Sequence, residues 1–117
     1  MEARAQLGKR AEALVASYLE REGFTVLARN ARVGRLEIDV VARHKRLIVF
    51  CEVRSRTSDQ LMSPAHTIDA EKVARVRRAA SLWLRDAKVV GVDVRFDAAA
   101  VVFDTPDGRI EYYEGAF

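Results

Sequence analysis

The chain has 117 residues, half of them apolar, which is the size of one domain and enough for a hydrophobic core without disulfides. A single cysteine excludes an intrachain disulfide, no apolar run is long enough to span a membrane, and the first residues lack a signal-peptide pattern. We therefore expect one cytoplasmic domain over residues 1–117. Its net charge is +3, and Arg is more frequent than Lys. This charge fits nucleic-acid binding, but it also fits a chain that is simply rich in Arg.

The first half of the chain predicts one helix and a hairpin. Apolar residues recur at spacings of three and four along residues 4–22, which predicts an amphipathic helix that ends at Gly23. Apolar or alternating runs predict strands at residues 24–28, 36–42 and 47–55. Residues 30–34 are expected to form a loop, and a charged turn at residues 43–46 joins the second and third strands into an antiparallel hairpin.

The second half predicts a long helix followed by three strands. The helix follows a polar loop at residues 57–67, in which Ser63 or Thr67 is a suitable N-cap, and it runs to about Asp86. Strands are expected at residues 89–96, 98–103 and 110–113. The last two are joined by a turn at residues 105–108. The order α-β-β-β-α-β-β-β predicts an α/β fold with a mixed central β-sheet flanked by helices.

Charged side chains gather on one face of the first predicted hairpin. A tight turn centred on residues 44–45 would place Glu37 opposite Glu52 and Asp39 opposite Phe50. Alternation along the strands then puts four charged residues on the same face: Glu37, Asp39, Glu52 and Arg54. Facing carboxylates repel each other, unless a divalent cation such as Mg²⁺ or Mn²⁺ lies between them. The alternative is a solvent-facing strand in which Arg54 only neutralises Glu52.

A cation held here would polarise a phosphodiester and lower the pKa of a bound water, while Arg54 would hold a phosphate oxygen. Two further residues fit such a site. Glu12, at the edge of the apolar stripe of the first helix, would reach over the sheet; alternatively, it pairs with Lys9 or Arg10. Lys72 interrupts the apolar row of the second helix, so its amine turns either toward the carboxylates or phosphate, or out to water.

Arginines also mark the exposed side of the second predicted helix, at Arg75, Arg77 and Arg78. Together with Lys72, Arg54 and Arg56 they would follow a nucleic-acid backbone. The alternative is an ordinary solvated helix face. Other reactive residue types suggest no chemistry, because Cys51 alternates onto the apolar face of its strand and Trp83 falls on the core stripe of its helix.

Several short motifs occur together along nearly the whole chain: Gly8-Lys9-Arg10-Ala11-Glu12, Glu37-Ile38-Asp39-Val40-Val41-Ala42, Val49-Phe50-Cys51-Glu52-Val53-Arg54-Ser55-Arg56, Lys72, Trp83-Leu84, Arg95-Phe96-Asp97 and Ala116-Phe117. With these motifs the chain resembles the YraN-like family of uncharacterised bacterial proteins. Members of this family are described as predicted endonucleases, similar to archaeal Holliday-junction resolvases and placed in the restriction-endonuclease-like superfamily.

The resemblance implies a metal site formed by Asp39, Glu52 and the peptide carbonyl of Val53, assisted by Glu12. The lysine that the superfamily carries two residues after the glutamate is Arg54 here. Arginine stays protonated and positions charge, but it does not act as a general base. If the reaction needs a lysine, Lys72 is the residue that we expect to supply it.

We therefore expect a nucleic-acid-binding protein that is a Mg²⁺- or Mn²⁺-dependent endonuclease hydrolysing DNA phosphodiesters, including branched DNA. A resolvase-like reaction would need a homodimer, because two strands are cut symmetrically. Two alternatives keep the fold without the reaction. One is a non-catalytic DNA-binding module, which Arg54 favours, and the other is a partner subunit of a DNA-processing complex.

Overall fold

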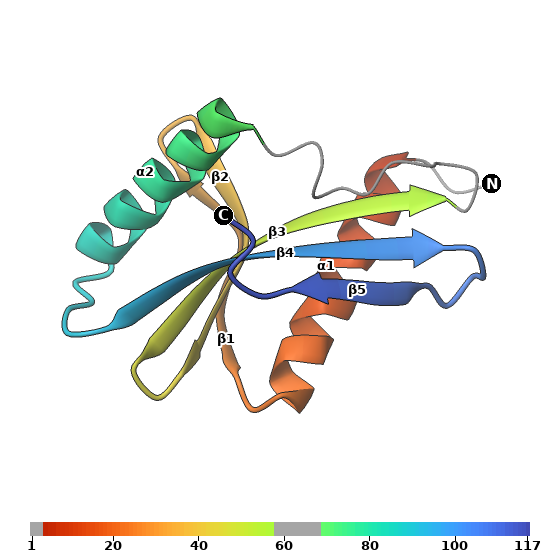
Figure 1. Cartoon of the computed structure of the whole chain (residues 1–117), viewed down its shortest axis with the longest axis horizontal. Coiled ribbons are helices and arrows are strands. Elements are labelled where there is room, and N and C mark those ends of the chain that lie inside the picture. Colours follow the sequence, from red (N-terminus) through yellow and green to blue (C-terminus); the bar gives the residue numbers. More distant parts are fainter. Residues whose placement is uncertain (1–3, 58–68) are drawn as a thin grey trace.

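The structure, a computed structural model, describes residues 4–57 and 69–117 (Figure 1). Its elements are α1 (Arg4–Arg21), β1 (Thr25–Val33), β2 (Leu36–His44), β3 (Leu47–Thr57), α2 (Ala70–Asp86), β4 (Asp93–Phe103) and β5 (Arg109–Tyr113). The strands form one sheet in the order β1-β2-β3-β4-β5, in which β3 and β4 are parallel and the other neighbours are antiparallel. Helix α2 connects the two parallel strands. This mixed sheet with flanking helices confirms the predicted fold class.

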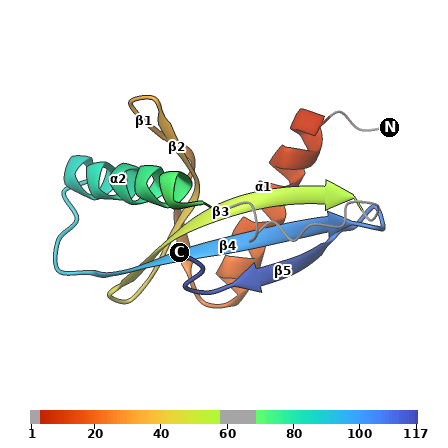
Figure 2. The same ribbon diagram turned by 45° about the horizontal axis from the view of Figure 1, so that its top comes forward.

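The two helices pack on opposite faces of the sheet (Figure 2). Helix α1 buries Ala11, Val15 and Leu19 against one face, and α2 buries Ala79 and Ala80 against the other. In β3, Val49 and Cys51 belong to the α1 side, whereas Ile48 and Phe50 belong to the α2 side. The alternation predicted for this strand is therefore confirmed, and it puts Glu52 and Arg54 on the α2 side.

Strand β1 is longer than the sequence pattern predicted. It continues to Val33 and stays paired with β2, with Ala31 opposite Ile38. Asn30 lies inside the strand with a φ of 51°, a left-handed conformation that asparagine tolerates better than most residues. The predicted loop is therefore wrong for residues 30–33, which backbone pairing with β2 holds in the sheet, whereas Gly34 lies in the turn between β1 and β2.

Helix α2 begins at Ala70, later than expected. Its N-cap is Asp69, whose Oδ1 accepts a hydrogen bond from the backbone N–H of Lys72 at 2.8 Å. The predicted cap at Ser63 or Thr67 is wrong, and both of those residues lie outside the described residues. The cap fixes the first turn of α2, and Lys72 lies in that turn.

Strand β4 passes continuously through Asp97, where the sequence suggested a break between two strands. Asp97 is fully buried, and its partners explain why an acidic residue stays within the sheet. Arg95 Nε and Nη2 each donate to its carboxylate at 2.9 Å, Tyr112 Oη donates at 2.6 Å and the Gly115 N–H donates at 2.9 Å. The expected strands at residues 89–96 and 98–103 are therefore replaced by one strand, which begins only at Asp93 and leaves residues 89–92 outside the sheet.

The β2–β3 hairpin is antiparallel as predicted, but its register differs by two residues. Lys45 adopts a left-handed φ of 56°, so the chain reverses in a two-residue turn and His44 pairs with Leu47. The expected pairing of Asp39 with Phe50 is wrong, since Val41 occupies that position. A shift of two residues preserves the alternation in the paired part of the hairpin, where Val40 and Ala42 lie on the α1 side and Val41 lies on the α2 side.

Among the described residues, neither helix combines the length and the apolar character that a membrane crossing requires.

Candidate functional site

The candidate site lies where strands β2 and β3 part. Their backbone pairing ends with Val40 opposite Cys51, so Asp39 and Glu52 are the first residues beyond the ladder. The Asp39 carboxylate instead accepts the backbone N–H of Val53, with Oδ2 2.8 Å from the nitrogen. From here β1 and β2 turn away from β3 and pass beside α2 (Figures 1 and 2). The end of the pairing therefore brings two acidic side chains, Asp39 and Glu52, to the point where the two strands part.

Glu52 is held by basic residues from two elements. It is only 8% exposed, and Lys72 Nζ from α2 lies 2.7 Å from its Oε1. Arg54, two residues along the same strand, brings its Nε to 3.8 Å from the same oxygen. The structure thus turns the amine of Lys72 toward the carboxylates, as one of the two sequence-based interpretations expected.

The pKa of Asp39 is raised by burial and by repulsion from neighbouring carboxylates. Burial, followed by the negative charge of Glu52, raises the pKa of Asp39 from its ordinary value of 3.8 to about 7, although the Val53 N–H opposes this rise. Glu12 and Glu37 add smaller effects in the same direction. Asp39 is therefore protonated more readily than an exposed carboxyl group, first because it is buried and then because other carboxylates lie near it.

Glu12 reaches this region from α1. Burial, together with the charge of Glu37, raises the pKa of Glu12, and its Oε2 is buried without a hydrogen-bond partner among the described residues. Arg29 and Asn30 of β1 also interact with it and act in the opposite direction. The charges of Glu37 and Lys9 both act on Glu12, so its role at the acidic cluster stays a prediction.

The donor set decides which cation would fit. In the part of the chain that the structure describes, no group of three or more His, Cys, Asp or Glu side chains is arranged to hold a metal. Asp39 and Glu52 with the carbonyl of Val53 would leave the remaining positions to water and substrate. Mg²⁺ is usually bound in this way, through one or two carboxylates.

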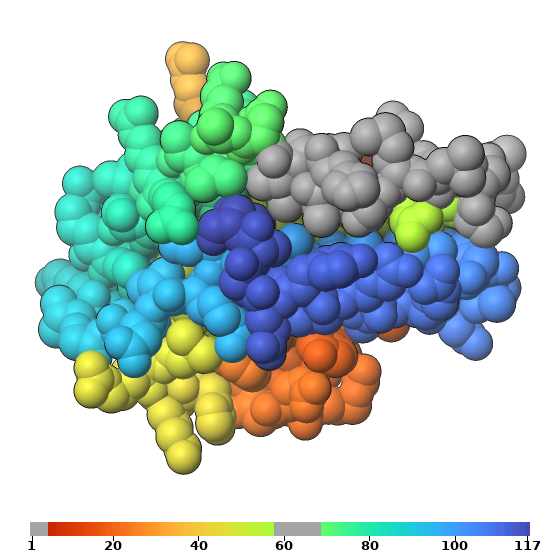
Figure 3. Space-filling view, in the orientation of Figure 1, coloured from red at the N-terminus to blue at the C-terminus, as the bar shows by residue number. Residues whose placement is uncertain are grey.

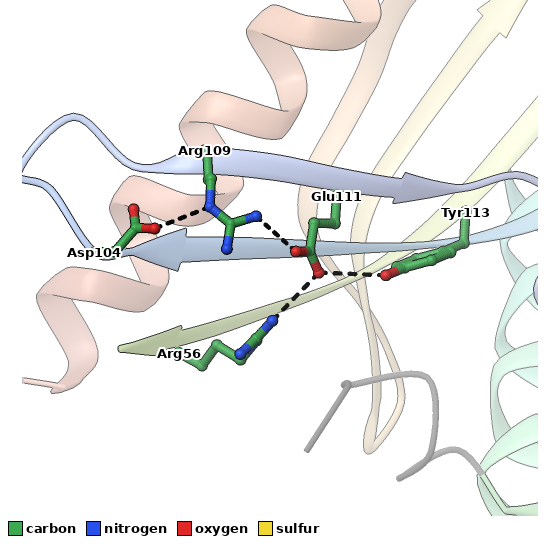
Figure 4. A network of polar contacts seen from close by, with 5 residues as sticks. All are labelled: Arg56, Asp104, Arg109, Glu111 and Tyr113. Atoms are coloured by element: carbon green, nitrogen blue, oxygen red, sulfur yellow. Dashed lines mark hydrogen bonds and ion pairs between the residues drawn. The ribbon is translucent and has the colours of Figure 1, made fainter. Parts of the chain in front are cut away.

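The predicted nucleic-acid-binding residues fall into two environments. Arg75 and Arg78 are exposed on α2, and Arg75 borders a hollow beside Lys72 and Glu37. Arg56 instead lies on β3 with its Nη2 3.4 Å from Glu111 Oε1. Figure 4 shows that Arg56 belongs to a network of alternating charges on the sheet. The charge of Arg56 is therefore already balanced within the protein.

The sequence was then compared with known proteins. The model of the uncharacterised protein family UPF0102 matches residues 11–101. The chain belongs to this family. A UPF0102 protein of Sorangium cellulosum is 48% identical over 99% of this chain and 83% of its own length. UPF0102 proteins of Anaeromyxobacter dehalogenans and Syntrophotalea carbinolica are 40% and 36% identical, each over 97% of this chain, and are covered over 85% and 93% of their lengths.

Membership in UPF0102 confirms the resemblance to the YraN-like proteins. The residues matched by the UPF0102 model include every candidate site residue, from Glu12 to Arg78. The names of the relatives give the family and no activity.

Sequence reasoning about this UPF0102 chain missed two charged residues. Asp97 was used to separate two strands and as part of a family motif, although an acidic residue inside an apolar run signals a buried ion pair. Arg35, in the turn before β2, borders the same hollow as Lys72 and Arg75, and no sequence pattern marks it. The predictions for Cys51 and Trp83 are confirmed, since Cys51 is 1% exposed and Trp83 packs against the core beside Phe50.

Proposed function

We propose that this protein is a Mg²⁺- or Mn²⁺-dependent nuclease that hydrolyses DNA phosphodiesters. The observation that supports this best is the junction of Asp39, Glu52 and Lys72. Two carboxylates lie where β2 and β3 part, and an ammonium from α2 is 2.7 Å from one of them. Acidic residues that attract a metal and cations that attract a phosphate are the two requirements of metal-assisted phosphodiester hydrolysis.

Asp39, Glu52 and the carbonyl of Val53 are the groups that would hold the cation. When bound, Mg²⁺ supplies a polarised phosphate and a water of lowered pKa. The hydrogen bond from the Val53 N–H fixes the orientation of the Asp39 carboxylate, with a distance of 2.8 Å. Val53 supplies both this N–H and the carbonyl of the donor set. The hydrogen bond therefore also fixes Asp39 relative to that carbonyl.

Lys72 and Arg54 would stabilise the negative charge that develops on the phosphate. In the reaction a bond forms between the water oxygen and phosphorus, the ester bond to the leaving oxygen breaks, and a proton passes to that oxygen. Arg54 remains a cation and holds a non-bridging oxygen. Lys72 donates hydrogen bonds as an ammonium, and the Glu12 carboxylate orients the attacking water as an accessory group.

A DNA-binding module without catalysis is the second candidate function. It is favoured by Arg54, which occupies the position where a lysine would act as a base in the superfamily that the sequence resembles. The same surface would then bind phosphate and leave the diester intact. The two functions differ in a single observable, the formation of cleaved product in the presence of a divalent cation.

Cleavage of a panel of labelled DNAs tests the proposal. Single-stranded, duplex, flap and four-way-junction DNA are incubated with Mg²⁺, Mn²⁺ or EDTA and with wild type, Asp39→Ala or Glu52→Ala. We expect cleavage only by wild type with a divalent cation, while circular dichroism shows that both variants are folded. Binding of DNA without any product, with both cations and all substrates, would replace the nuclease proposal by the binding module.

A further inference from the structure

Two hollows adjoin between α2 and the turn that connects β1 and β2. The first, of about 190 Å³, is bordered by Arg35, Glu37, Lys72 and Arg75 among others. The second, of about 340 Å³, is bordered by Arg35 and Arg78 above apolar side chains. Because Arg35 and Leu36 line both hollows, they form one continuous depression, which we call the basic trough. Figure 3 shows the β1–β2 hairpin projecting beside α2 at this part of the surface.

Positive charge is placed along both walls of the basic trough. On α2, Lys72, Arg75 and Arg78 follow one another at intervals of three residues, so they form a row about 9 Å long on one side of the helix. Arg35 stands on the opposite wall. The acidic residue that borders the trough is Glu37, at the end nearest the candidate metal site.

The arginines of the trough differ from others in the protein. Within residues 4–57 and 69–117, Arg35, Arg75 and Arg78 form no ion pair with an acidic side chain. On the uncovered sheet face, by contrast, Arg56 and Arg109 are paired with acidic residues (Figure 4). With respect to the residues that the structure describes, the positive charge on α2 and the β1–β2 turn is therefore available for a polyanion.

The trough is also continuous with the candidate site. Lys72 borders its first hollow and at the same time lies 2.7 Å from Glu52. A chain of phosphates with one member beside Lys72 would therefore have neighbouring phosphates along Arg75, Arg35 and Arg78. Guanidinium groups bind phosphate oxygens through paired hydrogen bonds, which suits these positions to the backbone rather than to the bases.

We propose that the basic trough binds the phosphates of a nucleic-acid strand on one side of the cleaved phosphate, with Arg35 and Arg78 holding the strand from opposite walls. This inference rests on the proposed nuclease function. Arg35 thereby becomes a substrate-binding residue supplied by the β1–β2 turn. The trough would position the strand, and the acidic cluster would hold the cation for hydrolysis of the phosphodiester.

Binding measurements without metal test the trough separately from the reaction. The affinity for fluorescently labelled DNA is measured by anisotropy in EDTA at several salt concentrations. The variants are Arg35→Gln/Arg78→Gln and a control with the same charge change, Arg21→Gln/Arg46→Gln, at positions away from the trough. Each lost phosphate contact reduces the magnitude of the slope of log K against log salt by about 0.7 to 0.9. The trough variant loses two arginines, so we expect its slope to be smaller than that of wild type by about 1.4 to 1.8. The control variant should have the same slope as wild type.

A small diester separates this inference from the proposed function. Bis-p-nitrophenyl phosphate has no flanking phosphates, so its Mg²⁺-dependent hydrolysis by wild type tests the nuclease proposal without the trough. If the trough variant binds DNA with the affinity and slope of wild type, or if wild type does not bind DNA, the trough inference is overturned. If the slopes differ as expected but wild type cleaves neither DNA nor the diester, the trough stands and the nuclease proposal fails.

Discussion

Lys72 on α2 and Glu52 on β3 meet with Nζ and Oε1 2.7 Å apart. The contact joins the first turn of a helix to the strand that carries the candidate metal ligand. It depends on Asp69, because this N-cap fixes the turn that presents Lys72. The chain carries Arg54 where the superfamily that the sequence resembles carries a lysine, and Lys72 brings its amine to Glu52 from another element.

Replacing Lys72 tests whether this ammonium takes part in the reaction. Under the nuclease proposal, Lys72→Met should lower kcat by about 10²- to 10³-fold, the usual cost of losing a group that stabilises transition-state charge. Lys72→Arg keeps the positive charge and should retain more of the activity. Steady-state DNA cleavage measures both values, and thermal unfolding shows that the variants are folded. Full kcat in Lys72→Met would remove Lys72 from the mechanism.

Asp39 should destabilise the metal-free protein as the pH rises. Its pKa is raised in the folded state from 3.8 to about 7, so the folded protein holds this proton more tightly than the unfolded chain. Its contribution to stability is present below pH 4 and is lost as the pH rises through about 7. Urea unfolding in EDTA should therefore show that Asp39→Asn gains more stability relative to wild type at pH 8 than at pH 5. An equal difference at both pH values would contradict the repulsion described for the site.

Asp97 should be essential for the stability of the sheet. Asp97→Ala leaves the Arg95 guanidinium and the Tyr112 hydroxyl without their buried acceptor, and removal of one partner from such a group costs about 3 kcal/mol or more. Urea unfolding measures the change. Asp86 makes an exposed ion pair with Arg85, so Asp86→Ala should change the free energy of unfolding by less than about 1 kcal/mol. Equal effects of the two substitutions would refute this role.

Cys51 should be unreactive in the folded protein. Burial raises the pKa of its thiol well above the ordinary value, so the thiolate that attacks alkylating reagents does not form near neutral pH. We expect no modification by iodoacetamide at pH 8 until denaturant unfolds the chain. Ser81→Cys provides a control, since position 81 is exposed on α2 and its thiol should react at once. Rapid modification of wild type would show that the core around β3 opens.

Patterns that depend on neighbouring residues were predicted correctly from the sequence. The apolar periodicity of α1 and the alternation of β3 are properties of short segments, and both are confirmed. The predicted hairpin register was wrong by two residues, because Lys45 takes a left-handed conformation that a lysine in the sequence does not predict. The error left Asp39 and Glu52 on their predicted strands, which is why the acidic pair was still recognised.

Features that depend on distant partners were beyond the sequence pattern. The continuity of β4 depends on Tyr112 and Gly115, which reach Asp97 only after the chain has turned into β5 and beyond. The meeting of Lys72 with Glu52 depends on the packing of α2 over the sheet, so the sequence offered it as one of two orientations. Arg35 was missed because a turn arginine has no periodicity to follow.

Cation binding at Asp39 and Glu52 is the most direct test of this account. Isothermal titration calorimetry with Mn²⁺, in the absence of DNA, compares wild type with Asp39→Asn and Glu52→Gln, and it needs no cleavage to give a result. Partners of metal ligands alone contribute about 10- to 100-fold in affinity, so we predict that loss of either carboxylate weakens Mn²⁺ binding by about tenfold or more. Equal affinity in all three proteins, or no binding by wild type, would contradict the account.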